Sequence, residues 1–380
     1  MRIYIPMMGL GESGGVKVIF KLADYLINDG HEVFILTFKE GSHEKLNFTT
    51  KANIKYIKLS SLIRKTLLIP VLRDFVKCWY LYKNLPKSDL AIANYFLTAY
   101  PVWLSHEPKY KFYYCQAFEP KFFYTYRQEK VSLKQALKIV RNAFYRYLAR
   151  KSYKLGLFMV ANNETIVKSI KAINKDSSLY IPILPPGVDT SIFKPKYDKN
   201  NELLKVGVIA SPNFWKGTKY LLDAIMLLKK EGVRFNVVCA FGPPPKGSPV
   251  VDAKWVNPRS QEELADFYRN LDVFVSPMLI LNEFPLPPLE AMACGVAVIS
   301  TPLIYGEHKI HYYETPSEDS KAIANALIEL AQNIDLRKKI ASTGYELSKN
   351  FDWEVIGNKM ITILKEYIGS FSSAQEEILH

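Results

Sequence analysis

A strand–turn–helix–strand pattern between Val273 and Ser300 constrains the fold of this chain more than any other stretch. Two apolar runs, 273–277 and 296–300, predict buried strands, and the small residues between Leu289 and Gly295 predict a helix. Strands connected by a helix usually lie parallel, and ligands bind beyond the carboxyl ends of parallel strands. The pattern therefore predicts an α/β fold with a ligand site where this helix begins.

The start of this helix carries a carboxylate beside backbone groups that the helix itself leaves unpaired. Free N–H groups in a first helical turn suit an anion such as a diphosphate. Glu290, one turn into the helix, is placed to accept hydrogen bonds from a ribose diol. The alternative is a plain strand-to-helix connection in which Glu290 only complements the helix dipole.

Strand and helix patterns alternate through the whole chain in two rounds. The first round runs from Arg2 to Leu184 and the second restarts at Leu204, after the polar linker 196–202. A chain of 380 residues is also too long for one ordinary domain. We therefore expect two Rossmann-like α/β domains, 1–195 and 203–350, and a C-terminal helix and tail, 351–380, that packs back on the first domain.

The first strand is followed by a glycine-rich turn that has two interpretations. Gly9, Gly11 and Gly14 match the G-x-G-x-x-G fingerprint of dinucleotide-binding folds. Such glycines let the backbone approach a phosphate or a sugar, and they also serve any tight strand-to-helix turn. The acidic residue expected at the end of the second strand is absent there, because Glu40 follows Phe38 and Lys39. An NAD-dependent oxidoreductase is therefore kept as an alternative.

Two polar residues follow another strand of the first half. Gln116 and Glu119 come directly after the apolar run 111–115. At the carboxyl end of a parallel strand they are candidates for contacts with a substrate, and a plain loop is the alternative.

The charge of the chain is concentrated in its first half. Residues 1–190 carry a net charge of +15, whereas the whole chain carries +13, so the remaining residues carry −2. Part of it lies on the basic, amphipathic helix expected at 131–154, which either contacts an anionic membrane or packs its apolar stripe on the domain. A solvated basic face and an anionic acceptor are further explanations, whereas no nucleic-acid recognition motif is present.

Three further features indicate where the protein resides. No apolar run reaches the roughly 18 residues of a membrane span. The chain opens on a strand pattern at Arg2, which predicts that it lacks a signal peptide. Its four cysteines are scattered, as is typical of reduced thiols. We expect a cytoplasmic protein, with peripheral contact to the inner face of the membrane as the further possibility.

The ordered set of local motifs resembles the GT-B glycosyltransferases, in particular the large retaining family 4, glycosyl transferases group 1. The set spans most of the chain, and a local Gln116-x-x-Glu119-Pro120 pattern is similar to a bacterial rhamnosyltransferase subgroup. The motifs of the ordered set are Gly14-Gly15, Gly30-His31-Glu32-Val33, Pro186-Gly187-Val188-Asp189, Phe193-x-Pro195, Trp215-Lys216-Gly217, Leu271–Pro277 and Pro288–Gly295.

The resemblance implies two Rossmann-like domains that face each other across a cleft, and a role for each matching residue. Lys216 would meet the donor phosphates, Glu290 would hold the ribose, and Gln116 would take the place of a histidine of the first domain. The catalytic residues implied are Lys216, Gln116 and Glu283. The donor-binding residues implied are Gly14, Gly15, Ser211, Lys216, Asn282, Glu283, Phe284, Pro285, Leu286 and Glu290, and the acceptor-binding residues are Gln116 and Glu119.

The sequence departs from the family pattern around the expected diphosphate. The first carboxylate of the family's E-x7-E pair is Asn282 here, with Glu283 one residue late, and Pro285 has no N–H to donate. Ser211 stands where the family has a phosphate-binding arginine. Arg259 and Lys219 are the candidates to supply the missing positive charge.

The sequence contains no Asp-x-Asp motif, so we expect no metal or other cofactor. The function that the resemblance implies is a metal-independent, retaining, hexosyltransferase-type enzyme. It would move a sugar from a nucleotide diphosphate donor to a hydroxyl of a glycan or lipid-linked acceptor, in cell-surface polysaccharide synthesis. A non-catalytic sugar-nucleotide-binding protein is the second alternative beside the NAD enzyme.

Overall fold

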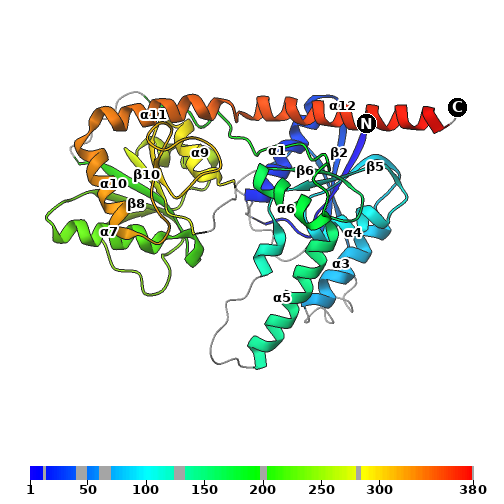
Figure 1. The fold of residues 1–380 in the computed structure, drawn as a ribbon, viewed down its shortest axis with the longest axis horizontal. Helices are drawn as coiled ribbons and strands as arrows, with labels where there is room; N and C mark the ends of the chain where they lie inside the picture. Colours follow the sequence, from blue (N-terminus) through cyan, green and yellow to red (C-terminus); the bar gives the residue numbers. More distant parts are fainter. Residues whose placement is uncertain are drawn as a thin grey trace. The chain divides into compact units, whose positions relative to one another are not determined.

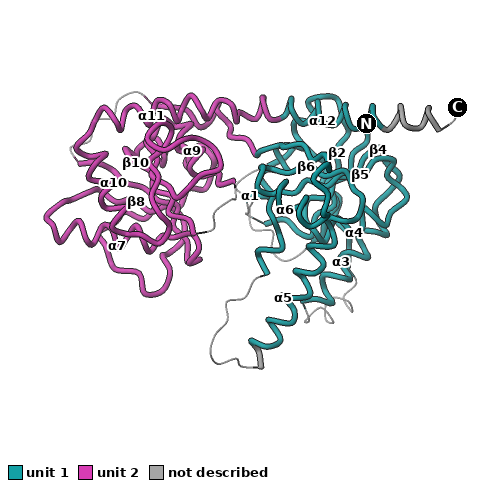
Figure 2. Tube along the Cα trace, viewed as in Figure 1, with its two compact units in different colours: residues 1–185, 357–380 teal, residues 186–356 magenta. Residues whose placement is uncertain are grey.

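The computed structural model describes residues 1–11, 14–39, 49–59, 70–123, 133–196, 203–279 and 284–378. The chain divides into two compact units (Figure 2): unit 1 comprises Met1–Pro185 and Gly357–His380, and unit 2 comprises Pro186–Ile356. The first division falls before the expected boundary at residues 195–203. The reason is that the segment after Pro185 packs on unit 2, where the Phe193 ring is buried against Tyr268 and the Lys194 carbonyl accepts from Arg269 Nε at 3.1 Å.

Unit 1 contains a six-stranded sheet in the order β3-β2-β1-β4-β5-β6, and every strand pair in it is parallel. Figure 1 labels β2, β5 and β6 of this sheet among the helices of the unit. Its strands are continuous apolar runs because parallel strands are covered on both faces. The elements are β1 (Arg2–Pro6), α1 (Gly14–Asn28), β2 (Glu32–Phe38), β3 (Asn53–Ile57), α3 (Pro70–Asn84), β4 (Ser88–Ala93), α4 (Phe96–Leu104), β5 (Pro108–Cys115), the 3-10 helix η1 (Glu119–Phe123), α5 (Leu133–Ser152), β6 (Phe158–Ala161) and α6 (Glu164–Asn174).

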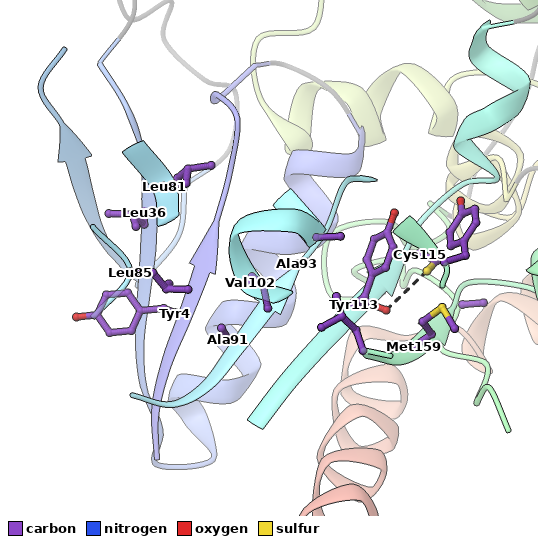
Figure 3. Packing of buried hydrophobic residues seen from close by; sticks show 14 of the residues in the cluster. Tyr4, Leu36, Leu81, Leu85, Ala91, Ala93, Val102, Tyr113, Cys115 and Met159 are labelled. Carbon is purple, nitrogen blue, oxygen red and sulfur yellow. Dashed lines mark hydrogen bonds between the residues drawn. The ribbon is translucent and has the colours of Figure 1, made fainter. Parts of the chain in front are cut away.

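The core of unit 1 lies between this sheet and its helices. Figure 3 shows the side chains of Tyr4, Ala91, Tyr113 and Met159 from neighbouring strands packed together with helix residues such as Leu81. Tyr113 is fully buried and lies two residues before the end of β5. This packing fixes the loop that follows β5, which carries Gln116 and Glu119.

The last helix, α12 (Trp353–Ile378), contributes its later residues to unit 1. The Tyr367 ring stacks on Phe158 with centroids 4.1 Å apart, and its hydroxyl donates to the Lys111 carbonyl at 3.3 Å. A side chain at Gly357 would collide with Tyr25, because a Cβ there would lie 2.0 Å from the ring. The C-terminal helix therefore packs directly on the first Rossmann-like domain.

Unit 2 contains a second six-stranded sheet in the order β12-β11-β10-β7-β8-β9, again parallel in every pair. The elements are β7 (Lys205–Ala210), the 3-10 helix η2 (Phe214–Lys216), α7 (Thr218–Lys230), β8 (Asn236–Phe241), β9 (Ala253–Val256), α8 (Gln261–Arg269), β10 (Val273–Ser276), α9 (Leu286–Ala293), β11 (Ala297–Ser300), β12 (Tyr313–Glu314), α10 (Ser320–Gln332) and α11 (Ile334–Lys349).

The two sheets have the same topology. In each unit the first strand lies between the second and the fourth, so the strand order reverses at that point. Ligands of doubly wound α/β folds bind beyond the carboxyl ends of the strands at such a switch point. The switch points are β1/β4 in unit 1 and β7/β10 in unit 2, and a candidate site is expected in the loops that follow these strands.

Candidate functional site

The switch point of unit 2 is closed by a loop that packs tightly on the end of β10. Gly217 has a φ of +72°, and a Cβ there would lie 1.6 Å from the Pro277 carbonyl oxygen, so only glycine fits. The Trp215 carbonyl also accepts from the Leu279 N–H at 2.9 Å. The loop 211–217 after β7 is therefore held directly beside the segment that follows β10.

Lys216 ends the short helix η2 within this loop. Its side chain is half-buried, and no carboxylate of the described residues lies within 4.0 Å of its ammonium group. Lys219 differs, because its ammonium lies 2.5 Å from Asp223 Oδ2 on α7. Lys216 is thus the lysine of this loop whose charge is available to an anion, whereas the charge of Lys219 is already matched.

Ser211, at the position of the family arginine, shapes the loop itself. Its N–H donates to Thr218 Oγ1 at 3.2 Å, and its hydroxyl oxygen accepts from the Asn213 N–H at 3.2 Å. These bonds join the end of β7 to the first residue of α7. Ser211 therefore lies in the expected loop with its polar groups engaged in the turn.

Helix α9 begins at Leu286, three residues earlier than the sequence indicated. Its N-cap is Pro285, and Pro287 and Pro288 occupy its first turn. Proline has no N–H, so Leu286 supplies the only N–H among these four positions. This helix start therefore offers fewer N–H donors to an anion than the sequence indicated, and its role toward a diphosphate stays a prediction.

Glu290 lies in the second turn of α9 and is only 5% exposed. The Tyr268 hydroxyl of α8 donates to its Oε2 at 3.1 Å. Burial, together with the nearby carboxylate, raises the pKa of the Tyr268 hydroxyl far above its usual value, which keeps this group a donor. Tyr268 therefore fixes the orientation of the carboxylate, and the ribose role of Glu290 stays a prediction.

Two of the expected donor-binding residues before α9 have structural contacts. The Phe284 ring packs against Tyr305 and Phe351, with centroids 4.7 and 5.3 Å away. The Tyr305 hydroxyl donates to the Pro285 carbonyl at 2.7 Å. Asn282 and Glu283 lie outside the described residues. The segment next to the helix start is thus anchored by aromatic packing from Tyr305, which follows β11, and from Phe351, which follows α11.

Arg259 follows β9, farther along the same edge of the sheet. It is exposed, and its backbone N–H donates to Glu263 Oε2 at 2.8 Å. Among the described residues, no carboxylate lies within 4.0 Å of the Arg259 guanidinium, whereas the Lys219 ammonium is paired with Asp223. Of the two residues expected to replace the family arginine, Arg259 is therefore the one without such a pairing.

In unit 1, the structure brings Gly15 and Gln116 together. Gly14 and Gly15 open helix α1, and a Cβ at Gly15 would lie 3.4 Å from Gln116 Oε1. The Gln116 carbonyl accepts from Asn162 Nδ2, at the end of β6. A small residue at Gly15 therefore leaves room for the Gln116 amide at the carboxyl edge of the sheet.

Glu119 is placed differently from an exposed acceptor-binding group. It is 2% exposed, and its carboxylate accepts from the Phe96 N–H at 3.0 Å and from the hydroxyls of Tyr113 at 2.6 Å and Tyr153 at 3.1 Å. Burial raises the pKa of this carboxyl to about 7, although these donors favour its charged form. Glu119 links α4, β5 and the end of α5. We therefore expect Glu119 to influence an acceptor only indirectly, by holding the loop that follows β5.

Two residues that the sequence did not single out contribute to this arrangement. Asn162 supports Gln116, and Tyr268 supports Glu290. Both lie on elements distant in sequence from the groups that they contact, so no local pattern could reveal them. Among the described residues, no three His, Cys, Asp or Glu side chains gather in a way that could hold a metal ion.

Comparison with known proteins agrees with this geometry. Residues 200–333 match the family model described as glycosyl transferases group 1. The phosphatidyl-myo-inositol mannosyltransferase of Mycobacterium leprae is 29% identical over 229 residues, which is 57% of this chain and 58% of that protein. The aligned part thus spans little more than half of that relative.

Solved structures share the fold over nearly the whole chain. Sucrose-phosphate synthase from Thermosynechococcus elongatus superposes with a TM-score of 0.76 at 16% identity, covering 97% of this chain and 99% of that one. Anabaena HepE in complex with UDP-glucose superposes with a TM-score of 0.71 at 14% identity, covering 96% and 100%. With a parallel, doubly wound sheet in each unit, the chain has the fold of the GT-B glycosyltransferases, and residues 200–333 of its second unit are similar to the glycosyl transferases group 1.

Proposed function

We propose that this protein is a metal-independent, retaining glycosyltransferase. It moves a sugar from a nucleotide diphosphate donor, bound by unit 2, to a hydroxyl of a glycan or lipid-linked acceptor, bound by unit 1. The observation that carries this proposal is the switch point of unit 2, where the loop with Lys216 is held beside the end of β10 and Glu290 lies on the helix that follows. The HepE complex with UDP-glucose supports this class of donor.

Positive charge is the main requirement of the proposed reaction. When the bond between sugar and diphosphate breaks, negative charge grows on the leaving diphosphate, and groups aimed at it lower the barrier. The start of α9 offers few N–H donors because of its prolines, so a larger share of this stabilisation falls to Lys216. Arg259 is the second cation that we propose for the nucleotide.

We place the acceptor on unit 1, beside Gly15 and Gln116. The Gln116 amide can donate to and accept from a sugar hydroxyl at the same time. The Mycobacterium leprae relative is named for a lipid-linked inositol acceptor, which supports a lipid-linked or glycan acceptor here. Cell-surface polysaccharide synthesis is the process in which such a transfer takes place.

A membrane-facing surface fits this class of acceptor. The apolar stripe of α5 was expected either to pack on the domain or to face a membrane, and the structure shows Leu137 at 64% and Val140 at 68% exposed. The buried residues of α5 lie on another face, around Tyr145 and Ala149. Nearby, the exposed rings of Phe75 on α3 and Phe144 on α5 lie 5.9 Å apart.

Basic residues flank these exposed apolar side chains. Lys138, Arg150 and Lys151 are exposed on α5. Apolar side chains that enter the lipid boundary beside cations that meet anionic headgroups are typical of peripheral membrane contacts. No helix of the described residues has the length and apolarity needed to cross a bilayer. We therefore propose reversible, peripheral contact of α3 and α5 with an anionic membrane.

The proposal is tested by ligand binding followed by turnover. The full chain is screened by thermal shift against UDP, GDP, ADP, dTDP and NAD, and the sugar donors of the nucleotide that binds are then assayed with glycan and lipid-linked acceptors. Transfer with retention of the anomeric configuration supports the proposal. Binding of NAD alone would favour an oxidoreductase, and binding without any transfer would favour a sugar-nucleotide-binding protein.

A further inference from the structure

Phe241, the last residue of β8, has a backbone conformation that is unusual for a bulky residue. Its φ is +72°, in the left-handed region. An aromatic residue is unfavourable there because its Cβ crowds the neighbouring backbone, whereas glycine adopts this conformation freely. Folding alone would therefore favour glycine at this position.

Burial does not explain the aromatic ring either. Phe241 is 37% exposed, and none of the ring contacts found among the described residues involves it. The core contacts of β8 come from Val237, Cys239 and Ala240, all of which are buried. A strained and exposed aromatic residue that the core does not use is a candidate for contact with a ligand.

The position of Phe241 connects it to the proposed donor site. β8 pairs in parallel with β7, and Phe241 lies opposite Ala210, the residue before Ser211. The next residues also meet, because a Cβ at Gly242 would lie 3.4 Å from Pro212 Cδ. Phe241 thus lies at the carboxyl edge of the sheet, one strand from the switch point and next to the loop that carries Lys216.

We propose that the ring of Phe241 is a stacking surface for the base of the donor nucleotide. This inference rests on the proposed function. Neighbouring strands lie about 4.8 Å apart, so a nucleotide whose phosphates lie by Lys216 on the β7 loop can extend its nucleoside along the edge toward β8. An aromatic ring stacks on any base through the faces of both rings, and this contact is sequence-tolerant. Phe241 would contribute affinity for the nucleoside rather than for the sugar.

The decisive variant is Phe241→Gly, because the two possible roles predict opposite results. A ligand role predicts that the variant is at least as stable as the parent, since the backbone strain is relieved, while its affinity for the nucleotide falls roughly ten- to a hundredfold. Phe241→Tyr keeps the ring and should bind as the parent does. Lys175→Gly, at a residue with φ +56° in unit 1, is the matched control: it relieves the same kind of strain and should leave affinity unchanged.

The measurement is titration calorimetry of the full chain with UDP, GDP, ADP and dTDP, together with thermal unfolding without ligand. If Phe241→Gly binds the same nucleotide as tightly as the parent, the stacking role is wrong while the proposed function stands. A large loss of thermal stability in Phe241→Gly would also overturn the proposal, because it would show that the ring serves the fold. A parent that binds none of the four nucleotides would overturn the proposed function itself and the stacking role with it.

Discussion

Replacing Glu119 with Gln tests how the loop that follows β5 is held. Gln has nearly the shape of the protonated carboxylic acid and cannot ionise. In the parent, the carboxyl is buried and its pKa is raised to about 7 from an ordinary value of 4.5. The variant therefore mimics, at every pH, the neutral form that burial favours.

The sign and the size of the effect follow from this raised pKa. The folded protein binds a proton that the unfolded chain has already released, so the contribution of Glu119 to stability is complete below pH 4.5 and is lost as pH rises to about 7. Each pKa unit corresponds to about 1.4 kcal/mol, so the free energy of unfolding of the parent should fall by about 3 kcal/mol relative to Glu119→Gln over this range. Groups that titrate equally in both proteins cancel in the comparison.

The assay is hydrogen–deuterium exchange of both proteins at matched pH values between ~4.5 and ~7.5. It reports the opening of α4 and β5 separately from that of unit 2. Glu164→Gln is a matched control, because Glu164 is an exposed first-turn residue of α6 paired with Lys168, and its difference from the parent should vary little with pH. A parent-to-variant difference at Glu119 that stays constant across this pH range would refute the reasoning.

Four further predictions concern the proposed reaction. Glu290→Gln should weaken nucleotide binding by about 1–3 kcal/mol in titration calorimetry, because it removes a buried charged acceptor, and unchanged affinity would remove the ribose role. Lys216→Gln should lower kcat by about a hundredfold or more, because it removes a charge aimed at the leaving diphosphate. Lys219→Gln is the control, since Lys219 is paired with Asp223. A normal kcat in Lys216→Gln would exclude Lys216 from stabilising the diphosphate. Transfer activity should persist in EDTA, and a loss that Mg²⁺ or Mn²⁺ restores would contradict this. Replacing Lys138 and Arg150 with Gln should weaken co-sedimentation with anionic vesicles at low salt without changing nucleotide affinity, whereas equal binding to neutral vesicles would argue against the proposed membrane contact.

The sequence by itself determined the elements and their class. Apolar runs such as 273–277 and 296–300 became β10 and β11, since a strand covered on both faces must be apolar along its whole length. Alternation of strand and helix predicted the two parallel sheets, because parallel neighbours need a crossover connection. Lys216 and Glu290 lie in the segments that follow β7 and β10, beyond the carboxyl ends of these strands, as the strand and helix pattern predicted.

Only the tertiary structure decided what these residues contact. The sequence pattern indicated a helix from Leu289, but α9 begins at Leu286, so its prolines fall in the first turn, and the Phe284 ring just before it packs against Tyr305. Glu119 was indistinguishable from an exposed loop residue until Tyr113 and Tyr153, from β5 and the end of α5, enclosed it. Tyr153 lies 34 residues from Glu119, and Tyr305 lies after β11, so a local pattern gives no information about these two contacts.

The apolar stripe of α5 and the backbone of Phe241 show the same limit. Periodicity shows that Leu137 and Val140 share a face of a helix, but whether this face is buried depends on the elements that pack against the helix. The positive φ of Phe241 occurs where β8 ends, whereas the sequence around it would predict an ordinary strand residue. Sequence fixes which side chains are available and in what order, while burial, orientation and strain depend on contacts that exist only once the chain has folded.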